Sequence, residues 1–239
     1  MKISLIFFCL FLFIKGEITI DNCNNYIIDN NTINIAYSNN NYVCRLSGHT
    51  FNKSIILSNS ISVTLDSLIL ISTGSLTPII IEKNSEIKLN IRGNSYITDS
   101  PINENEGVIF MKEGSKLIIE GSILNINPNK KMAIKGEKDT SFCWKNGKIN
   151  IFSTSSNAGG IYIDKEILFI NGEFSYKAIS GKNNVIETSG SIMIINGYYS
   201  INTESGKGIK AGDNIYIGIK NYDNNNYDNN YYYCNNNNY

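Results

Sequence analysis

The chain has 239 residues, and its 21 lysine and arginine side chains balance 21 aspartates and glutamates, so the formal net charge is zero. It contains only two arginines, Arg45 and Arg92, whereas a nucleic-acid-binding protein carries a basic stripe. The composition therefore argues against DNA, RNA or an anionic membrane surface as a partner.

Residues 1–16 have the pattern of a secretory signal peptide. One lysine, Lys2, precedes an apolar run of roughly a dozen residues, and the small residue Gly16 follows it. The run is too short to span a bilayer comfortably, and no later stretch reaches the roughly 20 apolar residues of a membrane helix. We expect a secreted, extracellular mature chain with no membrane insertion after signal cleavage; an uncleaved anchor is the alternative.

Four cysteines remain once Cys9 leaves with the signal peptide: Cys23, Cys44, Cys143 and Cys234. An even number in an exported chain favours two disulfides, for which three pairings are possible. Cys23 with Cys44 is the simplest pair, because both lie in the amino-terminal segment and close a short loop; a bond from Cys143 to Cys234 would tie the end of the chain to its body. A zinc site is the rival hypothesis, but the chain has no CxxC pair and one histidine, His49.

Residues 17–54 are rich in asparagine and contain only short apolar runs. We predict that this segment is an amino-terminal cap, because the open strand edge of an unsealed solenoid would recruit other chains. Asn30 and Asn52 stand in Asn-x-Ser/Thr patterns, which in a secreted eukaryotic protein indicate exposed glycosylation sites.

Residues 55–218 contain a degenerate repeat of about 25 residues. Gly121, Gly147, Gly172 and Gly197 follow short strand-like runs at spacings of 26, 25 and 25 residues. A second short apolar strand recurs between them, and we expect the first strand of each turn at residues 55, 79, 108, 133, 160, 185 and 208. A fixed period built from β-branched runs indicates a solenoid. The predicted fold is an all-β, single-stranded, right-handed parallel β-helix of about seven coils.

The repeat also predicts how each turn is made. Glycine permits tight corners between strands. Asn146, Asn171 and Asn196 each precede one of the repeated glycines, where stacked amides can satisfy the backbone of the turn. Residues 219–239 then change to a low-complexity tail of asparagine and tyrosine, which cannot bury a core. We expect this tail to be disordered or to mediate self-association.

The stretch from about residue 89 to residue 217 resembles a known family. The resemblance rests on blocks that occur in the same order: Asn94–Asp99, Gly107–Phe110, Leu117–Gly121, Gly159–Asp164, Leu168–Glu173 and Lys207–Asp213. They are similar to those of secreted bacterial and anaerobic-fungal carbohydrate-binding domain-containing proteins. Characterised relatives of that family are calcium-bound right-handed parallel β-helices that bind acidic plant polysaccharide, and the resemblance implies the same fold and ligand class here.

The chain departs from that family at its acidic positions. The family's recurrent Asp-Gly-Ile step lacks its acidic residue at Gly159–Ile161, Asn184–Ile186 and Lys207–Ile209. A second acidic position is kept as Asp139, Asp164 and Asp213, which the resemblance implies as metal ligands. Calcium takes six to eight oxygen ligands with several carboxylates. These residues therefore predict a weaker calcium site, completed by carbonyl and asparagine oxygens.

Aromatic side chains recur along successive coils: Trp144, Tyr162, Tyr176, Tyr198 and Tyr199. A sugar face stacked on one ring removes apolar area worth roughly 1 kcal/mol, so a row of rings on a rigid face binds an extended glycan through many weak contacts. We predict these five residues as the carbohydrate-binding residues. The alternative is that they only fill strand positions, which tyrosine favours.

Three classes of function follow. The main hypothesis is a secreted, non-catalytic module that binds plant cell-wall polysaccharide. The alternative is a structural or adhesive surface β-helix that self-associates through its tail. A polysaccharide lyase or hydrolase is the third hypothesis. Glycoside hydrolysis needs two carboxylates, and adjacent coils could align Asp164 with Glu187 or Glu187 with Asp213. The competing interpretation is that these carboxylates are solvated side chains.

Overall fold

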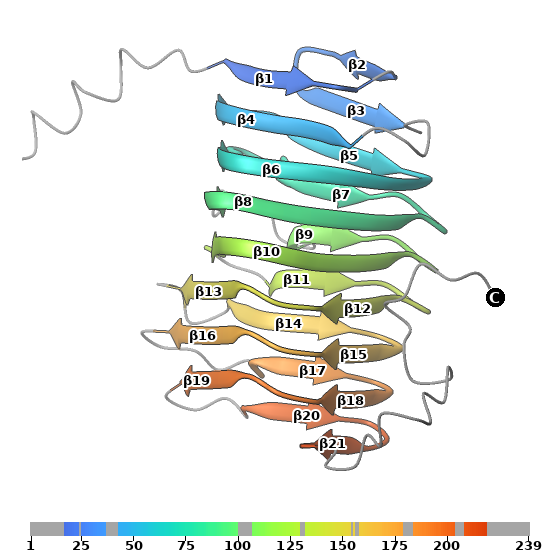
Figure 1. Ribbon diagram of the computed structural model, residues 1–239, viewed down its shortest axis with the longest axis vertical. Coiled ribbons are helices and arrows are strands. Elements are labelled where there is room, and N and C mark those ends of the chain that lie inside the picture. The colour runs from blue at the N-terminus through green and yellow to red at the C-terminus, as the bar shows by residue number, and fades with distance from the viewer. Residues whose placement is uncertain are drawn as a thin grey trace, which may run out of the picture.

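The computed structural model describes residues 17–23, 25–36, 43–99, 107–129, 132–153, 155, 158–178, 184–203 and 208–218. The regular secondary structure of this part of the chain consists of β-strands. They stack along the long axis from β1 at one end to β21 at the other (Figure 1). No described residue belongs to a helix long and apolar enough to cross a membrane. The predicted all-β parallel β-helix is confirmed.

The strands form two sheets, and each turn of the chain contributes to both. The larger sheet has 12 strands: β1 (Ile18–Asp21), β4 (Cys44–Phe51), β6 (Ser60–Ile71), β8 (Glu86–Thr98), β10 (Lys116–Asn127), β12 (Ser141–Trp144), β13 (Lys148–Ser153), β15 (Glu166–Phe169), β16 (Glu173–Ala178), β18 (Ser191–Ile194), β19 (Tyr198–Asn202) and β21 (Ile215–Ile217). The smaller sheet has nine: β2 (Tyr26–Ile28), β3 (Thr32–Ala36), β5 (Ser54–Ser58), β7 (Ile79–Ile81), β9 (Gly107–Met111), β11 (Met132–Gly136), β14 (Gly159–Ile163), β17 (Ile186–Thr188) and β20 (Ile209–Ala211).

The smaller sheet tests the predicted repeat directly. Its strands from β5 to β20 pair in parallel, each with the strand of the next turn. They begin at Ser54, Ile79, Gly107, Met132, Gly159, Ile186 and Ile209, each within one residue of the predicted position. These seven strands enclose about six turns of the solenoid.

The amino-terminal end of the solenoid is closed by antiparallel strands. β1 pairs antiparallel with β4, and β2 pairs antiparallel with β3. A disulfide joins Cys23 to Cys44 across a Cα–Cα distance of 4.6 Å, which confirms the predicted pair. Parallel stacking already begins inside the predicted cap, residues 17–54, because β3 pairs in parallel with β5 and β4 with β6.

Several sequence-based predictions concern residues at the margins of the described part. The signal peptide, the tail and Cys234 lie outside the described residues. Asn30 and Asn52, the predicted glycosylation sites, both lie in exposed turns, and glycosylation stays a prediction.

Inward-facing side chains of successive turns stack into continuous apolar ladders. In the larger sheet, Leu117 aligns with Phe142 and Ile167, and Ile119 aligns with Trp144. All of these residues are at most 1% exposed. Full burial of such a side chain stabilises the fold by roughly 1.5–3 kcal/mol. One turn cannot supply this burial alone, so the core depends on stacking.

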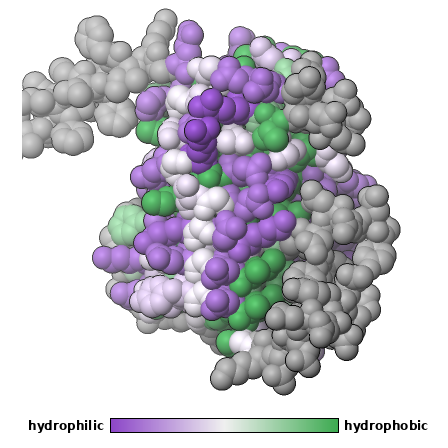
Figure 2. Space-filling view, in the orientation of Figure 1, coloured by the Kyte–Doolittle hydropathy of each residue, from purple (hydrophilic) through white to green (hydrophobic). Residues whose placement is uncertain are grey.

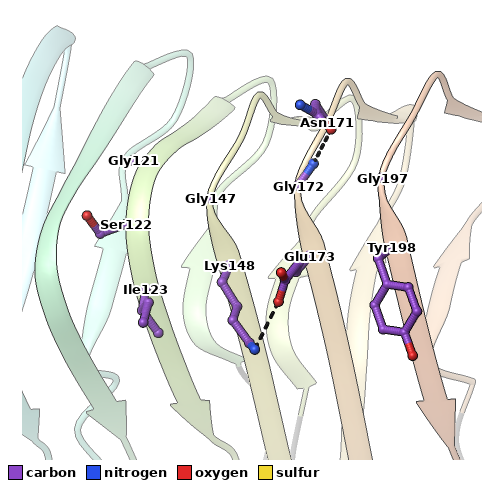
Figure 3. Close-up of a pocket in the computed structure, with 10 residues that line it drawn as sticks. All are labelled: Gly121, Ser122, Ile123, Gly147, Lys148, Asn171, Gly172, Glu173, Gly197 and Tyr198. Atoms are coloured by element: carbon purple, nitrogen blue, oxygen red, sulfur yellow. Dashed lines mark hydrogen bonds and ion pairs between the residues drawn. The ribbon is translucent and has the colours of Figure 1, made fainter.

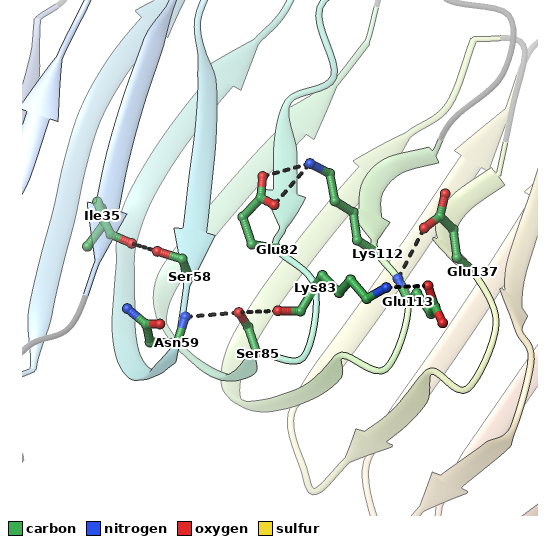
Figure 4. A network of polar contacts seen from close by, with 9 residues as sticks. All are labelled: Ile35, Ser58, Asn59, Glu82, Lys83, Ser85, Lys112, Glu113 and Glu137. Carbon is green, nitrogen blue, oxygen red and sulfur yellow. Dashed lines mark hydrogen bonds and ion pairs between the residues drawn. The ribbon is translucent and has the colours of Figure 1, made fainter.

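Polar side chains link neighbouring turns where the chain passes from the smaller to the larger sheet (Figure 4). Lys112 Nζ lies 2.8 Å from a carboxylate oxygen of Glu82, and Lys83 Nζ lies 2.7 Å from one of Glu113. The Glu113 backbone N–H donates to Glu137 one turn further on, at 3.1 Å. Exposed ion pairs contribute little stability individually, so we interpret these contacts as aids to register rather than as the source of stability.

The larger sheet bends at a column of glycines. Long strands β8 and β10 cross the bend, whereas later turns are split there into β12 and β13, β15 and β16, and β18 and β19. Gly121, Gly147, Gly172 and Gly197 all have positive φ, between 99° and 127°. A Cβ added at Gly147 would collide with the carbonyl oxygen of Gly121, and one added at Gly172 would lie 2.6 Å from that of Gly147. Backbone therefore packs directly on backbone at every bend.

This packing predicts an unequal cost for two glycine substitutions. Gly147→Ala should destabilise the protein by about 3 kcal/mol, because the new Cβ meets both a strained φ and a backbone oxygen that cannot move. Gly74→Ala is the matched control, since Gly74 also has positive φ but has nothing within 4 Å of its Cβ position. It should cost about 1 kcal/mol, from the left-handed backbone alone. Denaturant unfolding measures both, and equal midpoints would contradict the packing argument.

Candidate functional site

A shallow groove follows the glycine column along the solenoid axis (Figure 3). Its volume is about 560 Å³. The lining residues come from four successive turns: Gly121, Ser122, Ile123, Gly147, Lys148, Asn171, Gly172, Glu173, Gly197 and Tyr198. Because the glycines carry no side chain, the floor of the groove is peptide backbone.

Asparagines precede three of the glycines, and one of them, Asn171, lines the groove. The Oδ1 atom of Asn171 accepts a hydrogen bond from the Gly172 backbone N–H at 2.9 Å, and Asn196 does the same for Gly197 at 2.8 Å. Asn146 Oδ1 instead accepts from the N–H of Gly121 in the preceding turn, at 2.8 Å. The predicted role of these amides in satisfying the turn backbone is confirmed, and the three side chains stay exposed.

One rim of the groove is a ladder of outward-facing side chains just after each bend. Ile123 aligns with Lys148, Lys148 with Glu173, and Glu173 with Tyr198. Tyr198 is 68% exposed, so its ring is open to solvent. An apolar residue, a cation, an anion and an aromatic ring thus follow one another along the groove.

The charged pair on this rim is weakly held. Lys148 Nζ lies 2.9 Å from Glu173 Oε2, and both side chains are about half exposed, at 42% and 56%. An ion pair in such an environment contributes only about 0.2–1 kcal/mol. A ligand that offers a carboxylate or hydroxyl groups can therefore replace this contact at small cost.

Three of the predicted carbohydrate-binding residues, Trp144, Tyr176 and Tyr199, pack in or against the core instead. Trp144 and Tyr176 are at most 1% exposed, and their side chains face the core. Trp144 Nε1 donates to the carbonyl of Asn146 at 2.6 Å, and the Tyr176 hydroxyl donates to that of Ala158 at 3.3 Å. Burial raises the pKa of the Tyr176 hydroxyl. Sugar stacking on either ring is therefore excluded in this conformation.

Tyr199 is also a correction to the predicted row. Its ring packs on Phe169 at a centroid distance of 5.5 Å and on Trp144 at 6.5 Å. Its hydroxyl donates to the carbonyl of Asn196 at 3.1 Å, and burial raises its pKa. Strand alternation explains the outcome, because Tyr198 and Tyr199 are neighbours and must point to opposite faces. Tyr198 alone of this pair reaches the groove.

Tyr162 belongs to a different hollow. It lies on β14 in the smaller sheet and lines a cavity of about 520 Å³ with Glu113, Lys135, Gly136, Glu137, Lys138 and Asp164. Its hydroxyl lies 3.4 Å from Ser189 Oγ. Tyr162 and Tyr198 therefore do not form one row, and the expectation of a single aromatic face is wrong.

The three predicted metal ligands occupy turns between the two sheets. Asp164 Oδ2 accepts a hydrogen bond from the Asp139 backbone N–H at 2.9 Å, so this carboxylate ties two turns together. The Asp213 N–H donates to the carbonyl of Gly190 at 3.0 Å. Within the described ranges, no group of three or more histidine, cysteine or acidic side chains could hold a metal ion. Calcium binding stays a prediction, and nothing below depends on it.

The carboxylates considered for catalysis also have structural contacts. Glu187 accepts from Lys210 Nζ at 2.5 Å and from Asn184 Nδ2 at 2.7 Å. Asp164 bonds the backbone as described above. Lys148, Glu173 and the backbone floor were not predicted from the sequence as parts of the groove. Lys148 and Glu173 each directly follow a repeated glycine, and this position is the sequence signal that could have identified them.

Comparisons of the chain with known protein families, with curated proteins and with solved structures found no match.

Substitution of the adjacent residues Tyr198 and Tyr199 tests whether the first lies on the surface and the second packs against the core. Tyr199→Ala should destabilise the protein by about 3–5 kcal/mol, because it removes a ring from the aromatic cluster. Tyr198→Ala should change stability by less than about 0.5 kcal/mol, because the ring is exposed. Thermal or denaturant unfolding of the two variants checks this. A large loss for Tyr198→Ala would show that the groove tyrosine is structural.

Proposed function

We propose that this chain is a secreted, non-catalytic protein that binds polysaccharide, with plant cell-wall glycan as the ligand class, along the glycine-floored groove. The observation that carries the proposal is the groove itself. It is open, it runs across four turns, and its glycine floor recurs once in each turn of the solenoid. A repeating trough suits an extended ligand made of repeating units.

The chemistry of the lining residues supports a sugar chain. The exposed Tyr198 ring offers an apolar face for a pyranose, worth about 1 kcal/mol. Lys148 can meet a uronate carboxylate, and Glu173 and Asn171 can bond hydroxyl groups. Each contact is weak, so useful affinity requires several contacts along one chain. Binding to long polysaccharide should therefore greatly exceed binding to a monosaccharide.

Two further observations support an extracellular role. The Cys23–Cys44 disulfide is typical of exported proteins. The leader-like pattern of residues 1–16 points the same way.

A structural or adhesive role is the second candidate, and one feature favours it. The last described strand, β21, exposes Ile215, Tyr216 and Ile217 at 44%, 46% and 69%. The equivalent residues of β18, such as Ile192 and Ile194, are at most 5% exposed. Apolar residues on a terminal strand can add to a neighbouring molecule.

Affinity electrophoresis in gels that contain pectic or neutral plant polysaccharides, with and without calcium, tests the proposal. We expect retardation by at least one polysaccharide. Tyr198→Ala should raise the apparent Kd about fivefold, the loss expected for one stacking contact. Lys148→Gln should weaken binding to acidic polysaccharide only, because it removes a charge and keeps a hydrogen-bonding side chain.

Tyr26→Ala is the matched control, since Tyr26 is 44% exposed on β2 at the opposite end of the solenoid. This variant should bind as the parent protein does. Absence of retardation by every polysaccharide would reject the proposed function and leave the adhesive role. Release of new reducing ends or unsaturated products would instead support an enzyme.

A further inference from the structure

A second apolar surface lies on the outside of the larger sheet, across the bend from the groove. It belongs to one outward-facing ladder, whose members align strand by strand: Ser62, Lys88, Ile118, Cys143, Leu168, Met193 and Tyr216. The ladder is polar in its first two members and apolar from Ile118 onward. We refer to Ile118, Cys143, Leu168 and Met193 as the outer stripe.

Three members of the outer stripe are buried although they point away from the solenoid core, and the fourth, Met193, is partly buried. Ile118, Cys143 and Leu168 are 0%, 3% and 5% exposed. They form a cluster separate from the main core, flanked by partly buried Ile170 and Ile195. Hydrophobic side chains gather beside the bend over the lower turns of this face (Figure 2). The described strands all belong to the two stacked sheets, so none of them forms a layer over this surface.

The charged residue Glu166, a neighbour of the stripe, is partly buried as well. Glu166 is on β15, two residues before Leu168 and on the same outward side of the strand. Burial raises the pKa of the Glu166 carboxyl, against the opposing effects of Lys165, Lys116 and a hydrogen bond from Ser141. The partial burial of Glu166 agrees with the 5% exposure of Leu168 beside it.

The carboxy-terminal segment is placed to cover the outer stripe. The chain leaves β21 at Gly218, next to Tyr216, the last member of the ladder. Cys234 follows 16 residues after Gly218, a length that can span up to about 50 Å. From β21 to Cys143 on β12 the sheet is three strand spacings wide, or about 14 Å. The segment therefore reaches Cys143 with ample slack.

Composition and cysteine count favour the same occupant. Residues 219–239 contain six tyrosines, whose rings can cover aliphatic and thioether side chains while asparagines face water. Cys23 and Cys44 are bonded to each other, and the two other cysteines after residue 16 are Cys143 and Cys234. Residues 1–16 are the rival segment, but they precede β1, at the opposite end of the solenoid.

We propose that the outer stripe is the docking site of the chain's own residues 219–239, fastened by a disulfide between Cys143 and Cys234. The bond forms by thiol–disulfide exchange with an oxidised dithiol catalyst of the secretory compartment. The two cysteine thiols lose two protons and two electrons, one S–S bond forms, and the catalyst's disulfide is reduced to two thiols. The docked segment then acts as a strap that shields the last turns from other chains.

Limited chymotrypsin digestion of the full, oxidised chain tests the strap. Cleavage after tail tyrosines should leave the carboxy-terminal fragment attached on a non-reducing gel and release it on reduction. Peptide mapping without reduction should identify a Cys143–Cys234 cross-link within one chain. In Cys143→Ser, the fragment should be released without reduction. A Cys143–Cys143 dimer, or alkylation of both thiols in the native protein, would overturn the proposal.

A second variant tests the apolar contact separately from the disulfide. Leu168→Asn changes an outward side chain of the stripe and should speed tail cleavage about tenfold, because the strap opens more often. Ser175→Asn is the matched control, since Ser175 is outward on the neighbouring β16 and off the stripe. Equal cleavage rates in the parent and both variants would show that the stripe does not hold the tail.

Discussion

Direct stacking of backbone on backbone at the bend of the larger sheet is the constraint on which the rest of the structure depends. Each repeated glycine from Gly147 on sits against the carbonyl oxygen of the glycine one turn before it. A side chain at any of these positions would push two turns apart. The contact therefore brings equivalent residues of successive turns into line.

That alignment produces three different surfaces from one repeat. Inward positions form the aliphatic and aromatic ladders of the core. Outward positions after the bend form the rim of the groove, which ends in the exposed Tyr198. Outward positions before the bend form the outer stripe around Cys143. The bend separates the open trough from the apolar, largely buried stripe, so the proposed ligand site and the proposed docking site of the tail lie on different surfaces.

The fold could be predicted from the sequence because its signals are local. Short β-branched runs and evenly spaced glycines located seven strands to within one residue. The side-chain faces could not be predicted in the same way. A positive-φ glycine interrupts the alternation, so the face of Tyr176 or Tyr198 cannot be counted from residues before the bend. Trp144 precedes its glycine, and alternation from the inward Phe142 places it in the core, where Tyr199 packs against it.

Two other features of the surface have physical reasons of their own. Asp164, predicted as a metal ligand, also has a structural contact, because its carboxylate accepts a hydrogen bond from the backbone N–H of Asp139 in the preceding turn. The outer stripe did carry a signal. Runs such as Leu117–Ile119 and Ile167–Ile170 are apolar at every position, a pattern typical of strands covered on both faces.

Nitrogen–proton correlation spectra of the isotope-labelled protein, titrated with a plant cell-wall oligosaccharide, test the central claim most directly. The groove floor is backbone, so the amide signals of Gly147, Gly172 and Gly197 should shift together as ligand is added. The amide of Gly107, at the start of β9 in the smaller sheet, should stay in place. Shifts confined to the smaller sheet, or no shifts with any oligosaccharide, would contradict the account.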